Sequence, residues 1–449
     1  MKLLSERKQN EILTSQVNYF NHTDILQLFR DMQIDKSWSF NGFKPKDTGK
    51  WTHCYHRYPA KFIPQLVERL IEEYIITNDA HINDPFMGSG TTIVTAISRG
   101  FKASGTDINR IAYLMTKVKS TPIDPNYLEE KMEQILLRLS ELFSKDITPL
   151  IPERHIERIN YWFDEKNKIE LGEILRVIYE GDDKIIRDFL LIAFSHILKN
   201  CSIWLQGSTK PTRDFKKKPA EPLEAFRKHL KKMQKGNEEF YRVVPQKVRE
   251  NLKKYLNIRA QDAKKQPVED NSVDLIVSSS PYVTSYEYAD LHQLSTIWLD
   301  FADNLTAYKK EFIGSAYKFS EKRKLKSIIA KNIVDKMKQK SKKMAKEIET
   351  FFIDMQDVFD ESYRILKREG RCCYVIGDTV LKGINILNAE VFAESLQYSG
   401  FKLDKIIKRE IPLKILPQKR DEKTGRFASN DKANSEAYPF EYIVIGLKE

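Results

Sequence analysis

The sequence predicts an α/β fold in which a mostly parallel, doubly wound sheet is interrupted by an inserted helical domain. Strand and helix patterns alternate over residues 51–120 and again over residues 256–449, which is typical of a parallel sheet with helices on both faces. Between them, residues 121–255 are helical by periodicity, rich in Lys and Glu, and poor in strand candidates. Residues 1–50 are polar with scattered aromatics and are expected to form an arm or short helices.

The first alternating stretch contains two expected helices and two expected strands. Apolar residues at helical spacing predict a helix from Lys61 to Ile76, and a short apolar run predicts a strand from His81 to Asp84. After a turn that contains glycine, Thr91 to Arg99 is expected to be a helix and Lys102 to Thr106 a strand. In the helical stretch that follows, the Pro- and Lys-rich segment from Gly207 to Pro222 is long for a loop and is expected to be functional or mobile.

The second alternating stretch begins with the buried-strand pattern of Val273 to Ser278. Helical periodicity and apolar runs then alternate toward the end of the chain. The expected helices are Leu291 to Phe301, Tyr317 to about Lys346, Phe351 to Lys367 and Ala389 to Ser399, and the expected strands are Arg371 to Ile376 and Tyr442 to Leu447.

The composition is that of a basic globular protein. Of 449 residues, 41% are hydrophobic and 31% charged, which argues against a disordered chain. Lys and Arg outnumber Asp and Glu by 75 to 63, and this excess favours a polyanionic partner. No apolar stretch approaches the roughly 18 residues that span a membrane, and the first residues lack a signal-peptide core, so a cytoplasmic location is expected. The cysteines have neither zinc-site nor disulfide spacing and are expected to be reduced core thiols: Cys54, Cys201, Cys372 and Cys373.

A strand, a loop and a helix are expected within the segment INDPFMGSGTTIVTAISRG. The strand ends at Asp84, while Gly88 and Gly90 allow the backbone to turn tightly and to approach a ligand. Thr91 begins a helix whose N–H groups point toward the loop. Asp107 ends the next strand, where a carboxylate suits the two hydroxyls of a ribose. Together these residues predict a site for a nucleoside-containing cofactor.

The segment DPFMGSGTT resembles the cofactor loop of S-adenosylmethionine-dependent amino-methyltransferases of the N6-adenine/N4-cytosine DNA type, which is commonly D-P-F-x-G-x-G-T. The resemblance implies a Rossmann-like methyltransferase fold and S-adenosylmethionine as the cofactor. Asp84 would then face the methionine part, Asp107 the ribose and Asp262 the adenine, and HRYPAKFIP resembles the segment that closes over the methionine end. The implied cofactor-binding residues are Tyr58, Pro59, Asp84, Pro85, Phe86, Gly88, Gly90, Thr91, Asp107 and Asp262.

A second motif follows the strand that begins at Val273. The strand stops at the tetrapeptide Ser279-Ser280-Pro281-Tyr282, and ligands of such folds bind at the carboxyl ends of the strands. The tetrapeptide resembles the family's S/D/N-P-P-Y/F/W motif at three of four positions, and Ser280 stands where the family usually has proline. In this family a first-position serine favours cytosine N4 as the methyl acceptor, whereas aspartate is usual for adenine N6. Cytosine is therefore expected, with adenine as the alternative.

The chemistry of this reaction explains the residue types. An exocyclic amine is a poor nucleophile because its lone pair is delocalised into the ring, and two acceptors on its hydrogens help to localise that pair. Ser279 Oγ and the carbonyl of Ser280 are the candidates. Pro281 restricts the turn, and Tyr282 offers an aromatic face on which a base flipped out of the duplex can stack. The sulfonium is already an activated donor, so no metal is expected.

Two basic segments are expected to contact double-stranded DNA, and solvated surface loops are the alternative. A restriction–modification or related defence setting is expected, in which a companion restriction endonuclease is an open alternative, and the protein is expected to be a monomer or dimer. The candidate DNA-binding residues are Lys210, Arg213, Lys216, Lys217 and Lys218 in the first segment, and Lys419, Arg420 and Arg426 in the second.

Three alternatives stay open. An RNA methyltransferase acting on a guanine or adenine amine would share the fold and the turn, but no RNA-binding module is recognisable. A non-catalytic scaffold would account for Ser280 but not for the intact glycines, Asp107, Pro281 and Tyr282. A methyltransferase fused to a nuclease would need a carboxylate–lysine cluster in a domain of its own, and the helical region contains no convincing one.

Overall fold

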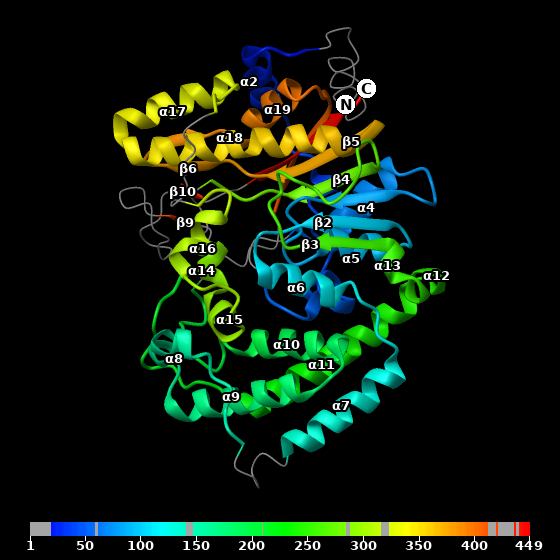
Figure 1. The fold of residues 1–449 in the computed structure, drawn as a ribbon. Coiled ribbons are helices and arrows are strands. Elements are labelled where there is room, and N and C mark those ends of the chain that lie inside the picture. Colours follow the sequence, from blue (N-terminus) through cyan, green and yellow to red (C-terminus); the bar gives the residue numbers. More distant parts are fainter. Residues whose placement is uncertain are drawn as a thin grey trace.

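The centre of the protein is a seven-stranded sheet (Figure 1). The computed structural model describes residues 19–58, 62–140, 147–208, 210–283, 288–315, 323–411, 419–420, 435–436 and 440–449. The strand order is β3-β2-β1-β4-β5-β11-β8. The strands are β1 (His81–Asp84), β2 (Lys102–Thr106), β3 (Leu256–Arg259), β4 (Val273–Ser279), β5 (Leu366–Ile376), β8 (Lys402–Glu410) and β11 (Phe440–Leu447).

Six of these strands run in one direction. Each neighbouring pair from β3 to β5 is parallel, whereas β11 is antiparallel to both β5 and β8, so β8 runs the same way as β5. The mostly parallel sheet confirms the predicted fold class. The carboxyl ends of β1 to β5 and of β8 therefore share one edge of the sheet, called the carboxyl edge below.

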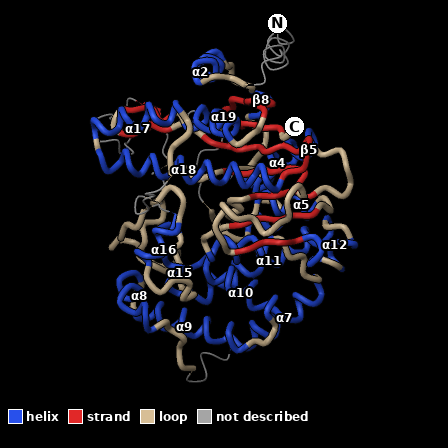
Figure 2. Tube along the Cα trace, turned by 45° about the horizontal axis from the view of Figure 1, so that its top comes forward, coloured by secondary structure: helices blue, strands red, loops and turns tan. Residues whose placement is uncertain are grey.

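Helices cover both faces of the sheet (Figure 2). On one face, α4 (Pro64–Tyr74) and α5 (Thr91–Ser98) enclose a core with apolar residues of β1, β4 and β11. On the other face, α18 (Lys342–Ile365) and α19 (Asn388–Tyr398) enclose a core with apolar residues of β4, β5 and β11, and α17 (Ile328–Lys340) packs against α18 and adds to this core. The pattern is the doubly wound arrangement that the sequence predicts.

The segment before the sheet docks on its β8 side. Helix α2 (His22–Asp31) packs on α19, and the backbone of Phe20 exchanges hydrogen bonds with the amide of Gln397 at 2.8 and 2.9 Å. Asp35 N donates to Lys408 O at 2.8 Å, next to the edge of β8. Three short helices complete this region: η1 (Lys36–Trp38), α3 (Pro45–Thr48) and η2 (Trp51–Cys54).

A helical layer lies below the sheet in Figure 1. It is joined to the sheet through α6 (Arg110–Lys119), which contacts α10. The core of this layer also takes in Leu294, Ile297 and Trp298, so a helix that follows the second motif belongs to it. Its helices are α7 (Pro125–Ser140), η4 (Glu153–His155), α8 (Ile156–Trp162), α9 (Glu165–Glu180), α10 (Lys184–Ile197) and α11 (Pro222–Val243). The next two helices, α12 (Gln246–Glu250) and α13 (Leu252–Tyr255), lead back to the sheet, where α13 contacts β2 and β3.

Several boundaries differ from the predicted ones. In place of one helix from Leu291 to Phe301, the structure has two short helices, α14 (Tyr288–Leu291) and α15 (Gln293–Trp298), separated by a break at His292. Helix α16 (Leu305–Glu311) follows them. The structure describes a helix from Ile328 in place of the long one expected to end near Lys346. It stops at Lys340, because Ser341 caps α18 by accepting a hydrogen bond from Met344 N.

Three further features stood outside the sequence prediction. Strand β8 was not expected, and the chain after β5 folds into a small antiparallel pair, β6 (Thr379–Leu381) and β7 (Ile384–Ile386). Another two-stranded pair, β9 (Lys419–Arg420) and β10 (Ser435–Glu436), lies between β8 and β11 in the chain. In the part of the chain that the structure describes, no helix has the length and apolar character needed to cross a bilayer.

Candidate active site

A pocket of about 820 Å³, open to solvent, lies at the carboxyl edge of the sheet. Ten of the residues singled out from the sequence line it: Tyr58, Asp84, Pro85, Phe86, Gly88, Thr91, Asp107, Asp262, Ser279 and Pro281. Segments that lie almost 200 residues apart in the chain therefore meet in one cavity.

Asp84 connects the first motif to the second. Its Oδ1 accepts a hydrogen bond from Phe86 N at 3.0 Å, which fixes the start of the glycine loop, and another from Ser278 Oγ at 2.7 Å, at the end of β4. The side chain is almost fully buried, and this burial raises the pKa of Asp84 to about 7. The carboxylate is thus poised to respond to a positive charge in the pocket.

Asp107 holds the glycine loop from the neighbouring strand. Its Oδ2 accepts from Gly88 N at 2.9 Å, and its Oδ1 accepts from Asn109 N at 2.8 Å. Asp107 keeps some contact with solvent through the pocket, yet the surrounding protein removes enough water to raise its pKa to about 6. The predicted acid at the end of β2 therefore lies beside the loop that it was expected to serve.

Glycine is required at both turns of the loop. Gly88 has φ +49°, and a Cβ there would lie 3.3 Å from the ring of Tyr58. Gly90 has φ +82° and precedes α5, and a Cβ there would lie 2.9 Å from Thr116 Oγ1 and 3.1 Å from its Cα. Both residues occupy the left-handed region, which favours glycine.

Tyr58 covers the loop from above the glycines. Its ring lies against Gly88 and stacks on His292 with ring centroids 5.1 Å apart. His292 is buried at the break between α14 and α15, so the segment after the second motif supports the residue that covers the first. Pro59, predicted beside Tyr58, lies outside the described residues.

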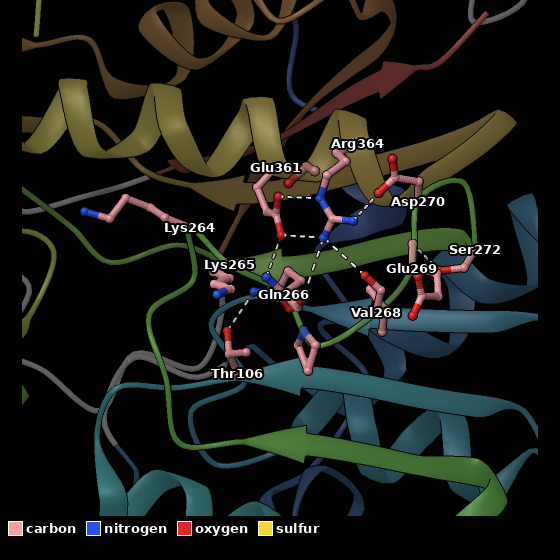
Figure 3. Close-up of polar contacts among 12 residues, drawn as sticks. Thr106, Lys264, Lys265, Gln266, Val268, Glu269, Asp270, Ser272, Glu361 and Arg364 are labelled. Atoms are coloured by element: carbon pink, nitrogen blue, oxygen red, sulfur yellow. Dashed lines mark hydrogen bonds and ion pairs between the residues drawn. The ribbon is translucent and has the colours of Figure 1, made fainter.

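Asp262 lines the pocket after the end of β3. Figure 3 shows how the following segment is fastened: Gln266 N donates to Glu361 Oε1 at 2.6 Å, and Gln266 Nε2 donates to Thr106 Oγ1 at 2.7 Å. Arg364 of α18 also donates to Val268 O at 3.2 Å. These bonds hold the loop between β3 and β4 against the sheet, and with it the position of Asp262.

The second motif follows β4 directly. Ser279 and Pro281 line the pocket, whereas Ser280 is buried and its Oγ has no hydrogen-bond partner among the described residues. Tyr282 is half-buried, and its ring packs on Gly377 just after β5, where a Cβ would lie 3.4 Å from Tyr282 Cε1. Ser279 and Pro281 of the turn therefore face the pocket, whereas Tyr282 packs against the end of β5.

The candidate DNA-binding residues differ in their surroundings. Lys210, Lys216 and Lys218 are exposed. Lys217 instead donates to the carbonyls of Lys199 at 2.6 Å and Trp204 at 2.8 Å, and burial lowers its pKa to about 8. Arg213 lies between two aromatic rings. In the second basic segment, the side chains of Lys419 and Arg420 and the whole of Arg426 lie outside the described residues.

Some site residues were missed by the sequence interpretation. Ser278 was considered only as the end of a strand, although its hydroxyl joins the two motifs. Glu311, Phe312 and Ile313 line the pocket from the end of α16 and the residues after it. Nothing in the local pattern of these three residues marks them. The run of three serines before Pro281 was the available signal for Ser278, because alternate residues of a strand face opposite sides.

Comparison with known proteins agrees with this geometry. Residues 5–117 match the model of the N6/N4 methyltransferase family, which is described as DNA methylase. The chain is 27% identical to the type II methyltransferase M.MvaI of Kocuria varians over 413 residues, which is 86% of this chain and 90% of that protein. The family match and this relative support a DNA amino-methyltransferase of the N6/N4 type. The matched residues include the glycine loop, and the tetrapeptide turn lines the same pocket.

Two other relatives match shorter stretches. Type II methyltransferase M.MjaII of Methanocaldococcus jannaschii is 32% identical over 166 residues, which is 35% of this chain and 31% of that protein. Type II methyltransferase M.BsoBI of Geobacillus stearothermophilus is 24% identical over 282 residues, which is 55% of this chain and 52% of that protein.

The match to DNA methylases implies S-adenosylmethionine as the cofactor, and the pocket fits it. The glycine loop forms a cradle that a Cβ would obstruct, and two carboxyl groups, Asp84 and Asp107, line the pocket beside it. These groups suit an ammonium and ribose hydroxyls respectively. Within the described residues, no group of three or more His, Cys, Asp or Glu side chains is arranged to hold a metal ion.

Proposed function

We propose that this DNA methylase transfers the methyl group to N4 of cytosine in duplex DNA. The observation that carries the proposal is the 2.7 Å hydrogen bond from Ser278 Oγ to Asp84 Oδ1. It fastens the turn after β4 to the glycine loop, so that Ser279 lies in the same pocket as Asp84, Gly88 and Asp107. The choice of cytosine rests on the serine at the first position of the tetrapeptide, with adenine N6 as the alternative.

Bound S-adenosylmethionine would supply a methyl group on a sulfonium, which needs no further activation. Asp84 would hold the ammonium of its methionine part, Asp107 its ribose hydroxyls, and Asp262 its adenine amine. Tyr58, which stacks on His292 over the glycine loop, would cover the methionine end and exclude water. The raised pKa values of Asp84 and Asp107 support these assignments, because each carboxylate gains from a positive or hydrogen-bond-donating ligand.

The residues of the turn would act on the acceptor base. Ser279 Oγ and the carbonyl of Ser280 would accept hydrogen bonds from the exocyclic amine and localise its lone pair toward the methyl donor. Pro281 would keep this turn fixed, and Tyr282 would offer a stacking face to a base that has left the duplex. The contribution of the protein is mainly one of position, since the donor is already activated.

The DNA would lie along the carboxyl edge. Strand β8 ends at Glu410 and β11 begins at Phe440, and these two residues pair with each other. Phe440 also lies near Gly377 at the carboxyl end of β5, since a Cβ on Gly377 would lie 3.4 Å from Phe440 O. The chain between them, which carries Lys419, Arg420 and Arg426, therefore leaves and rejoins the sheet at the edge that holds the pocket. Such cations would bind phosphates.

A restriction–modification setting with a companion endonuclease is part of the proposal, supported by the three relatives named type II methyltransferases. The test of the reaction uses tritiated S-adenosylmethionine and mixed-sequence duplex DNA, followed by digestion to nucleosides. Labelled N4-methylcytosine is the expected product. Labelled N6-methyladenine would overturn the inference of cytosine from the serine at the first position of the tetrapeptide. Label found only when RNA replaces DNA would overturn DNA as the substrate class.

A further inference from the structure

The helical layer carries an aromatic and cationic patch that the proposed chemistry does not use. The rings of Tyr161 and Phe215 are 42% and 75% exposed, and Leu205 beside them is 39% exposed. Arg213 contacts both aromatic rings, so the two rings and the cation form one cluster. The segment from Gly207 to Lys218 also holds five cations and one acid, so the patch is strongly basic.

Arg213 forms the centre of this patch. Its guanidinium carbon lies 4.3 Å from the ring centroid of Tyr161 and 4.4 Å from that of Phe215. Within the described part of the chain, Arg213 forms no ion pair, and its buried Nε has no hydrogen-bond partner. The two cation–π contacts hold the guanidinium while its N–H donors form no hydrogen bond within the described residues, and such a planar fork suits a pair of acceptors.

The loop that presents Arg213 is fixed by many hydrogen bonds. Leu205 N donates to Thr212 O at 2.8 Å and Asp214 N donates to Ile203 O at 2.7 Å, so the two arms of the loop pair like strands. Lys217 ties the base of the loop by donating to two backbone carbonyls. Trp204 stacks on Trp162 of α8 with ring centroids 4.9 Å apart. The described part of the loop therefore presents a preformed surface, and its ligand would meet little ordering cost.

The patch is linked to the helix that follows the second motif. Arg158 of α8 lies 4.8 Å from the ring of Tyr161 and donates to Gln293 Oε1 at 2.8 and 3.2 Å. Gln293 begins α15. Figures 1 and 2 both place α8 beside α15, so the patch and the catalytic turn are joined through one packed pair of helices.

We propose that Tyr161, Arg213 and Phe215 form a base-reading element for the DNA substrate, an inference that rests on the proposed function. Arg213 would donate two hydrogen bonds to the O6 and N7 atoms of a guanine in the major groove. Phe215 would contact bases at the same step, and Lys216 and Lys218 would bind the flanking phosphates. The positive charge of the patch favours DNA over a protein partner, because the cations around its aromatic centre can bind phosphates.

The test compares the methylated sequences that each variant selects from a randomised duplex library. Arg213→Lys keeps the charge but loses the planar fork, and Phe215→Ala removes an exposed ring whose loss leaves the fold intact. Lys218→Ala is the matched control for phosphate binding alone. In Arg213→Lys we expect the preference for one guanine to fall by roughly 5- to 150-fold. Lys218→Ala should weaken binding equally for all sequences and leave the selected motif unchanged.

Two results would overturn the inference in distinguishable ways. If the wild type methylates a defined motif and both Arg213→Lys and Phe215→Ala select the same motif at the same rate, the patch does not read bases and the proposed function stands. If the wild type transfers no label to DNA while it still binds S-adenosylhomocysteine, the proposed function fails and the inference fails with it.

Discussion

Substitution of Gly90 by alanine should damage the cofactor loop through two separate effects. Gly90 has φ +82°, and an L-residue in this region costs about 1–2 kcal/mol. Its new Cβ would also lie 2.9 Å from Thr116 Oγ1 and 3.1 Å from the Cα of Thr116, and such overpacking costs about 1–3 kcal/mol. Thr116 cannot simply move away, because its Oγ1 donates to Gly88 O at 3.0 Å. We expect the free energy of unfolding to fall by about 2–5 kcal/mol.

Gly383→Ala is the matched control, because Gly383 has φ +75° with no atom within 4 Å of its Cβ position. It should lose only the backbone contribution of about 1–2 kcal/mol. Urea unfolding measures the stability of both variants, and calorimetric titration with S-adenosylhomocysteine measures the pocket, where only Gly90→Ala should lose affinity. The reasoning is refuted if the two variants lose equal stability and both bind the ligand like the wild type.

Three further predictions follow from buried charges. Burial raises the pKa values of Asp84 and Asp107 to about 7 and 6, so both carboxylates are protonated at low pH. The affinity for S-adenosylhomocysteine should therefore rise from pH 5.5 to about 7.5 and then level off. A flat pH profile in titration calorimetry would contradict this. Asp107→Asn should weaken that affinity by about tenfold or more at pH 8, since a charged acceptor contributes about 1.5–3 kcal/mol; unchanged affinity would remove Asp107 from the site. Arg409→Met should lower the free energy of unfolding by about 3–5 kcal/mol, because it leaves the buried carboxylate of Glu441 unpaired. The double variant with Glu441→Leu should recover much of this loss in urea unfolding. If it does not, the pairing argument is refuted.

The sequence predicted the pocket well where local patterns and topology coincide. Strands β1 and β2 have the predicted bounds, and their ends deliver Asp84 and Asp107 to one edge because neighbouring parallel strands share it. The glycine positions could also be predicted from the sequence, because few residues other than glycine adopt the left-handed conformation in a turn before a helix. The meeting of the two motifs also followed from the rule that the carboxyl ends of parallel strands share one edge of the sheet.

The remaining features depend on packing that no local pattern encodes. Six of the nine residues of β8 are charged, so it has no strand signal, and its pairing with β11 supplies the stability. The break at His292 was hidden because the apolar pattern continues across it, and stacking with Tyr58 explains the position of the ring. Phe312 and Ile313 reach the pocket only through the fold of the chain after α15. The loop that carries Arg213 was expected to be functional or mobile; its described part is fixed by contacts with α8 and by its own backbone bonds.

The most direct test of the central claim separates cofactor binding from chemistry at the two motifs. Single-turnover methyl transfer to duplex DNA is measured for the wild type, Ser279→Ala and Ser272→Ala, a control at the start of β4 whose hydroxyl donates to Glu269 O. The account predicts that Ser279→Ala lowers the rate by about 10²–10³, that the affinity for S-adenosylhomocysteine stays near that of the wild type, and that Ser272→Ala changes neither. A wild-type rate for Ser279→Ala, or a loss of rate matched by an equal loss of cofactor affinity, would contradict the assignment of the turn as the catalytic part of the site.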